Sequence, residues 1–153
     1  MGKVSNKYLE VDPYKIIEKG FHKDRNQVSE SIFSLCNEYM GVRNSFEEGV
    51  SLHSLKGTYF NGIIEYAKKD IDGAYLGVVK RSHFTINSVD FYKVRIYIDN
   101  VLIDLAKLKC SNFVRTLDMR TGLVSRNYIV TLGKKHVEFN GYDNLIVSAD
   151  SAY

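Results

Sequence analysis

The feature that most constrains the fold is a change of pattern at Ser31, after which short apolar or alternating runs are separated by turn residues. This spacing is typical of an all-β sandwich or barrel, in which brief strands alternate with tight turns. Glycines mark most of the breaks: Gly41, Gly49, Gly57, Gly62, Gly73, Gly77, Gly122, Gly133 and Gly141. We therefore expect a mainly antiparallel all-β fold, with at most short helices near the N-terminus.

The clearest local unit is the segment 92–105. Apolar and polar side chains alternate from Tyr92 to Ile98, which places them on opposite faces of a strand. Asp99-Asn100 follows, and both residue types tolerate the positive φ angles of a two-residue turn. The return strand continues the alternation with Val101, Ile103 and Leu105. The segment predicts a β-hairpin with one buried face and one solvated face.

Similar runs predict strands near 56–66, 75–80, 112–117, 123–131, 135–139 and 144–148, with turns at 118–122 and 132–133. A short helix is expected after Asp12-Pro13, because proline suits the first helical turn and Ile16, Ile17 and Phe21 can share one face. No internal repeat or low-complexity segment is present. A chain of 153 residues has the length of one domain, so we expect residues 1–153 to form a single unit.

Charge and N-terminal composition exclude two classes of partner. The 21 basic and 18 acidic residues leave a net charge of only +3, with no polycationic arm, so nucleic-acid binding has little electrostatic support. The N-terminus contains no apolar run long enough for a signal peptide core or a membrane span. We expect a cytoplasmic protein that binds neither nucleic acid nor membranes.

The adjacent carboxylates Glu47 and Glu48 are the first candidates for glycosidase-type chemistry, which needs two carboxyl groups across a sugar ring. Adjacent residues suit that role poorly, because on a strand their side chains point to opposite faces. We expect instead a solvated turn in which these charges support Arg43.

Other reactive residue types show no arrangement that indicates a catalytic or metal site. The histidines are widely scattered: His22, His53, His83 and His136. None has metal-ligand spacing, and Ser82-His83 lacks the context of a nucleophile elbow. Cys36 and Cys110 are isolated thiols, for which a buried apolar role is expected. We expect no metal, no cofactor and no catalytic residue in this chain.

Two further groups of residues could contact a sugar or phosphate. Basic pairs occur at Lys68-Lys69 and Lys80-Arg81, but no glycine-rich phosphate cradle lies beside them. Tyr39, Tyr59 and Tyr75 could stack on the C–H face of a pyranose, although strand aromatics more often belong to a core. These residues alone do not separate a binding role from a structural one.

Three blocks in order carry a family resemblance: residues 30–48, 55–62 and 115–126, which contain Glu-Tyr-Met-Gly-Val-Arg-Asn-Ser-Phe-Glu-Glu, Gly-Thr-Tyr and Leu-Asp-Met-Arg-Thr-Gly-Leu. They resemble the N-terminal domain of glycoside hydrolase family 65, the family of maltose, trehalose and kojibiose phosphorylases. The similarity runs from about residue 8 to 139. It implies the first part of a large β-sandwich of the galactose-mutarotase-like kind, which precedes two linker helices and a catalytic (α/α)6 barrel.

In that family the barrel supplies the general acid and the phosphate site, so the resemblance implies that this chain lacks both. Three positions depart from the pattern: Glu38 and Asn44 stand where the family has glycine, and Tyr14 stands for a common tryptophan. Glycine permits backbone angles that Glu38 cannot match, and Asn44 matches them better. Asp143-Asn144-Leu145 also replaces an expected step that contains arginine. These departures lead us to ask whether this copy supports an active enzyme.

The first hypothesis is a non-catalytic N-terminal β-sandwich portion that braces the barrel of a disaccharide phosphorylase or hydrolase. The chain alone is then not an enzyme, whereas its parent protein is. The partner is that catalytic barrel or a second copy of the chain, and an α-glucoside is a possible ligand. The alternatives are a freestanding carbohydrate-binding β module and a degenerate structural or oligomerisation domain. The candidate binding or domain-interface residues are Asn37, Arg43, Glu47, Glu48 and Tyr59.

Overall fold

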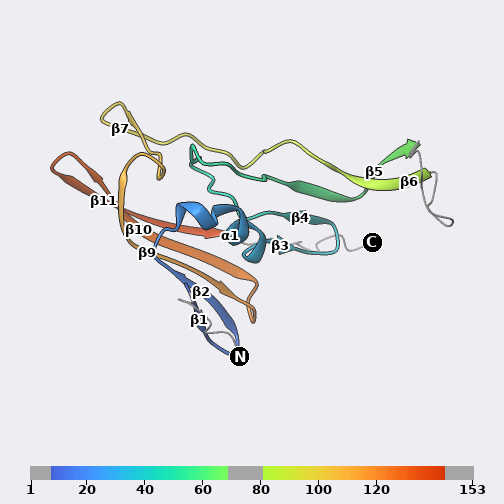
Figure 1. Ribbon diagram of the computed structural model, residues 1–153, viewed down its shortest axis with the longest axis horizontal. Coiled ribbons are helices and arrows are strands. Elements are labelled where there is room, and N and C mark those ends of the chain that lie inside the picture. Colours follow the sequence, from blue (N-terminus) through green and yellow to red (C-terminus); the bar gives the residue numbers. More distant parts are fainter. Residues whose placement is uncertain (1–7, 69–80, 144–153) are drawn as a thin grey trace, which may run out of the picture.

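The computed structural model describes residues 8–68 and 81–143, which form two main antiparallel sheets with one short helix between them (Figure 1). The larger sheet has five strands in the order β1-β2-β9-β10-β11. Their bounds are β1 Leu9–Val11, β2 Lys15–Lys19, β9 Lys109–Asp118, β10 Leu123–Leu132 and β11 Lys135–Asp143. The mainly antiparallel β fold expected from the sequence is therefore confirmed.

The second sheet has four strands in the order β3-β4-β5-β6, and a two-stranded ribbon, β7-β8, lies beyond it along the chain. Their bounds are β3 Leu35–Cys36, β4 Met40–Val42, β5 Thr58–Lys68, β6 Arg81–Asn87, β7 Tyr97–Ile98 and β8 Val101–Leu102. The helix α1 (Asn26–Ile32) follows the 3-10 turn η1 (Lys23–Arg25). Within the described ranges no helix is long and apolar enough to span a membrane.

The main core lies on one face of the larger sheet. Along most of β9 and β10 every second side chain points inward, and the alternation breaks only where the register of the two strands shifts between Asn127 and Ile129. The buried members of the core cluster are Phe46, Ile103, Leu105, Phe113, Tyr128 and Val130. A smaller cluster under α1 contains Phe33, Leu117 and Val124. The loop segments that follow β4 and β8 therefore cover this sheet, as the other layer of a sandwich would.

Both tight turns of the larger sheet lie where the sequence predicts them. Residues 118–122 join β9 to β10, and Gly133, with φ of 59°, joins β10 to β11. The Asp99-Asn100 turn is also confirmed, because φ is 49° and 62° at the two residues. Its ladder is shorter than expected, since β7 and β8 are only two residues each.

The buried face of the 92–105 hairpin is correct only near the core. Ile103 and Leu105 are fully buried, and Ile96 and Ile98 pack against the main core cluster. Val94 and Val101 instead remain exposed. The alternation alone therefore predicts more buried residues in this hairpin than the structure contains.

The helix expected after Asp12-Pro13 is wrong, because residues 15–19 form strand β2. This strand pairs with β1 on one side and β9 on the other. The β-branched Ile16 and Ile17 suit a paired strand, and Gly20 ends it with φ of 82°. The helix lies later in the chain, at α1, where no periodic apolar pattern predicts one. The strands expected at 75–80 and 144–148 fall outside the described residues.

The β5-β6 hairpin extends away from the rest of the molecule (Figure 1). Its large apolar side chains stay exposed: Ile63, Ile64, Tyr66, Phe84 and Ile86. Ile64 pairs with Thr85 and Glu65 pairs with Phe84, so apolar groups lie on both faces of the hairpin. Neither face has a covering layer among the described residues, in clear contrast to the larger sheet.

Candidate functional site

Two arginines occupy core positions of the larger sheet. Arg115 on β9 and Arg126 on β10 have relative exposures of 1% and 3%. Each follows the inward alternation of its strand, between the apolar residues of the two core clusters. A buried guanidinium must be paired, because leaving water without a partner costs several kcal/mol. The partners of these arginines therefore define the most heavily charged part of the interior.

Arg115 is held from β2 and from the segment after β4. Its Nε lies 3.3 Å from Glu18 Oε2, and Glu18 is directly opposite Arg115 in the β2-β9 register. Its Nη1 donates to both the carbonyl and the side-chain oxygen of Asn44, at 3.3 Å each. The guanidinium also lies over the rings of Phe46 and Phe33. Burial lowers the pKa of Arg115 to about 10, which still leaves it charged at neutral pH.

Arg126 is held mainly by Glu48. Its Nη2 donates to Glu48 Oε2 at 3.0 Å, and both side chains are only 4% exposed. The hydroxyl of Tyr128 donates to the other carboxylate oxygen of Glu48. Burial raises the pKa of Tyr128, and the nearby Glu48 charge raises it further. Glu48 is therefore a fully engaged structural carboxylate.

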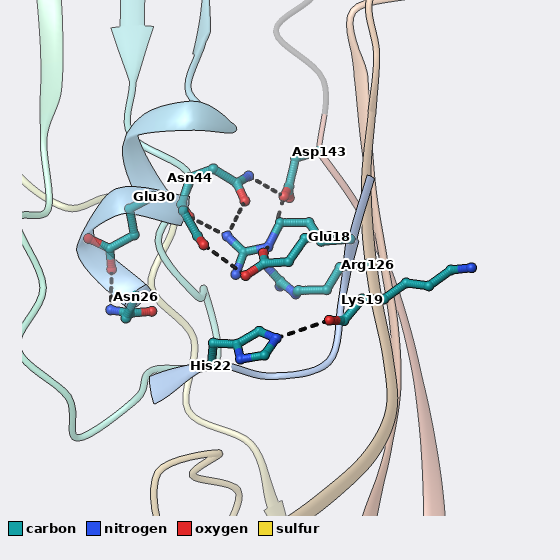
Figure 2. A network of polar contacts seen from close by, with 10 residues as sticks. Glu18, Lys19, His22, Asn26, Glu30, Asn44, Arg126 and Asp143 are labelled. Carbon is teal, nitrogen blue, oxygen red and sulfur yellow. Dashed lines mark hydrogen bonds and ion pairs between the residues drawn. The ribbon is translucent and has the colours of Figure 1, made fainter. Parts of the chain in front are cut away.

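Asn44 connects these two ion pairs. Its Nδ2 donates to Asp143 Oδ2 at 2.9 Å, while its Oδ1 accepts from Arg115 (Figure 2). Asp143 lies at the end of β11 and also lies 3.9 Å from Arg126 Nη1. We call this continuous set the polar junction: Glu18, Asn44, Glu48, Arg115, Arg126 and Asp143. It ties four strands of the larger sheet to the segment that follows β4.

Glu47 lies at the edge of the polar junction, facing Asp143. The pKa of Glu47 is raised to about 8, first by the side-chain hydrogen bond with Asp143 and then by burial and by the Asp143 charge. Two carboxyl groups in contact cannot both ionise at low cost, so Glu47 keeps its proton. Glu47 is therefore largely protonated at pH 7.

The turn expected at Glu47-Glu48 is present, but Glu48 is not solvated as expected. Glu48 is 4% exposed and its partners come from β10, not from Arg43. Arg43 turns toward α1 instead, where its Nη2 donates to Gln27 O at 3.1 Å and to Ser31 Oγ at 2.6 Å. Arg43 therefore contacts α1, whereas Glu47 and Glu48 contact the larger sheet. The structure does not bring these three residues together as one site.

Asn37 and Tyr59, the other two candidates, lie at the same hollow. Asn37 forms the turn between β3 and β4, and Tyr59 lies on β5 beside that turn. Both line an open hollow on the four-stranded sheet. This hollow is on a different sheet from the polar junction.

The conformational concern about Glu38 and Asn44 is also resolved. Neither residue has a positive φ, so their backbone angles do not require glycine. Asn44 gains a role instead, because its amide contacts both Arg115 and Asp143, and Asp143 in turn lies beside Arg126. The sequence signal that could have revealed this interior was the placement of Arg115 and Arg126 at inward positions of well-predicted strands.

The remaining reactive residues make local contacts. Across residues 8–68 and 81–143 no group of three His, Cys, Asp or Glu side chains could hold a metal ion. His22 contacts the carbonyl of Lys19, and His136 contacts Thr131. Cys110 is half-buried against the main core, whereas Cys36 is exposed, which corrects the buried role expected for it. These contacts are local and structural.

Comparison with known proteins identifies the relatives of this domain. The family model described as Glycosyl hydrolase family 65, N-terminal domain matches residues 16–142. The maltose phosphorylase of Bacillus subtilis (strain 168) is 33% identical over 134 residues, which cover 88% of this chain and 18% of that protein. The α,α-trehalose phosphorylase of Thermoanaerobacter brockii is 36% identical over 121 residues, covering 75% of this chain and 15% of that protein.

A solved structure described as a putative kojibiose phosphorylase from human microbiome superimposes with a TM-score of 0.78 at 51% identity. The match covers 88% of this chain and 18% of that chain. The chain therefore spans less than a fifth of the length of the relatives that it matches. The family match over most of the chain and the similarity of its β architecture lead to one conclusion: this chain belongs to the N-terminal domain family of glycosyl hydrolase family 65.

Proposed function

We propose that residues 1–153 act as a single non-catalytic β-sandwich domain that braces the catalytic barrel of a family-65 disaccharide phosphorylase or hydrolase. The family match supports this proposal, since each relative reported above extends far beyond the matched segment. The parent protein then carries the activity, and this domain supports it. The cytoplasmic location expected from the sequence stays a prediction.

The observation that carries the proposal is the contrast between a self-sufficient interior and an uncovered hairpin. The charged groups of the polar junction are engaged with one another, so they are poor candidates for acid-base chemistry. The β5-β6 hairpin, in contrast, exposes large apolar side chains that water solvates poorly. A bracing domain needs both properties, a rigid body and a surface that a neighbouring part can cover.

The structure also refines which candidate residues could act at an interface. Glu48 is buried in the polar junction, so we propose that it acts through the position of the Arg43–Glu48 segment and not by direct contact. Glu47 and Arg43 are partly accessible and remain the better candidates for contact with a barrel. Asn37 and Tyr59 lie on the other sheet and are treated separately below.

The proposal is tested by incubating purified 1–153 with maltose, trehalose or kojibiose and phosphate. We expect neither β-glucose 1-phosphate nor glucose above a blank. A matched binding experiment uses a family-65 protein expressed without its own N-terminal segment, with capture by tagged 1–153 as the readout. Phosphorolysis by the isolated chain, lost in Glu48→Gln, would overturn the non-catalytic role. Failure of every tested barrel to bind would contradict bracing.

A further inference from the structure

An open hollow of about 300 Å³ lies where the β3-β4 turn meets β5. Its polar lining comes from Asn37, Glu38, Asn61 and Thr85, and its aromatic lining includes Tyr59. That volume is at the lower end of the range found for small-molecule sites. The lining contains no lysine or arginine, in contrast to the polar junction.

An irregularity in β5 creates the hollow. Tyr59 pairs with Asn87 on β6, but the next regular pair is Ile64 with Thr85, so β5 uses extra residues over this stretch. Gly62 lies within it with φ of 79°, an angle that non-glycine residues rarely adopt. Bulges of this kind redirect side chains and are common beside functional sites.

One glycine gives the Tyr59 ring its place. At Gly57 an added Cβ would lie 2.6 Å from Tyr59 Cε2, which is closer than real atoms approach. The ring therefore lies over the backbone of Gly57 at the side of the hollow, and its position depends on the absence of a side chain there. The tyrosine remains 37% exposed.

The polar groups of the hollow are fixed by backbone contacts that leave part of each side chain available. Asn37 Oδ1 accepts from the backbone N–H of Tyr39 and of Met40, both at 2.9 Å. Its amide nitrogen, which takes no partner among the described residues, can still donate. Asn61 Nδ2 donates to the carbonyl of Glu38 at 3.0 Å, so its carbonyl oxygen can still accept. The hollow thus presents a fixed donor and a fixed acceptor.

We propose that this hollow, which is lined in part by β5 and β6, binds a neutral pyranose sugar. The Tyr59 ring offers an apolar face to the C–H side of the sugar, and the two amides and the Glu38 carboxylate bind its hydroxyl groups. A phosphate or other anion fits poorly, because Glu38 is acidic and no cation lines the hollow. The proposal does not rest on bracing of a barrel.

The test is a titration of ¹⁵N-labelled 1–153 with glucose, maltose, kojibiose and trehalose, followed by NMR. We expect the side-chain amide signals of Asn37 and Asn61 to shift saturably with at least one sugar. Tyr59→Ala should weaken that affinity at least tenfold. Tyr142→Ala is the matched control, because Tyr142 is an exposed tyrosine on β11 of the other sheet, and it should leave the affinity unchanged.

Glu38→Gln provides a second variant if Tyr59→Ala does not fold, since Glu38 is exposed and its carboxylate makes no ion pair within the described residues. We expect it to weaken sugar binding about threefold, because the glutamine amide oxygen still accepts a hydrogen bond and only the charge is lost. Absence of saturable shifts with all four sugars would overturn the proposal. Sugar affinity that is unchanged in the folded variants would also overturn it. The same holds if the hollow binds an anion, tested with inorganic phosphate, or a cation, tested with tetramethylammonium, in place of sugar.

Discussion

The two main sheets of this domain differ in how far their apolar side chains are covered. The five-stranded sheet covers its inner face with loops and buries even two arginines there, each with a carboxylate partner. The β5-β6 hairpin of the four-stranded sheet leaves apolar side chains exposed on both faces. The first region has a covered inner face, whereas the second leaves its apolar side chains uncovered among the described residues. This difference is the physical basis for proposing a supporting domain.

The contrast also separates two kinds of polar group. In the polar junction, charges are removed from water and hold the Arg43–Glu48 segment against β9 and β10. In the hollow beside Tyr59, amides are held by backbone contacts and remain accessible. Buried charges with an opposite partner fix a structure, while accessible and preorganised groups can bind a ligand. The following predictions test this division, beginning with the largest effect.

Removing a buried charge should have the largest effect on stability. Arg115→Ala leaves Glu18 buried without its cation, and we expect a loss of about 3–5 kcal/mol in unfolding free energy, measured by urea denaturation. Lys15→Ala is the control, because the Lys15–Asp118 pair is partly exposed and should contribute at most about 1 kcal/mol. Equal losses for the two variants would mean that the buried Arg115–Glu18 pair contributes no more to stability than a surface ion pair.

The 92–105 hairpin gives a smaller but sharper comparison of two adjacent residues. Ile96 packs against the main core, so Ile96→Asp should cost roughly 3 kcal/mol by placing a charge there. Tyr97 is 57% exposed, and Tyr97→Asp should cost less than about 1 kcal/mol. Thermal unfolding of both variants measures the difference. Similar costs would show that this hairpin does not cover the core.

Glu47 should make stability depend on pH. Its pKa is raised from 4.5 to about 8 in the folded chain, so the folded state binds more protons than the unfolded state between these values. This contribution is fully present below about pH 4.5 and is lost as pH rises through about 8. Because Glu47 is only partly buried, we expect roughly 1–2 kcal/mol. Wild type should therefore lose stability relative to Glu47→Gln as the pH is raised from 5 to 9. A difference between the two proteins that does not change with pH would show that the Glu47 pKa is not raised.

The smallest effect on stability is expected on the β5-β6 hairpin. Phe84 is 45% exposed, so Phe84→Ser should change the unfolding free energy by less than about 1 kcal/mol. The same substitution should reduce capture of a family-65 barrel, because it removes apolar area from the surface proposed to be covered. A large loss of stability in the isolated chain would mean that the hairpin is already packed.

Alternation along the chain predicts the larger sheet well because β9, β10 and β11 follow one another through tight turns, and their pairing is local in sequence. It fails at residues 15–19, where the strand state depends on β9, which lies about ninety residues later. The polar junction was missed for the same reason: Glu18, Glu48 and Arg126 come from distant segments, and only their pairing shows that their charges are buried. Asn37 and Tyr59 were predicted as binding candidates, but the bulge that joins them is set by the register between β5 and β6.

The most direct test of the central claim is amide hydrogen exchange of 1–153, alone and with a family-65 phosphorylase that lacks the matching N-terminal segment. Alone, β9 and β10 should be well protected and β5-β6 should exchange quickly, because its hydrogen bonds are exposed to solvent. Addition of the partner should protect β5-β6 and leave β9 and β10 unchanged. Strong protection of β5-β6 in the isolated chain, or no change on addition of the partner, would contradict the account.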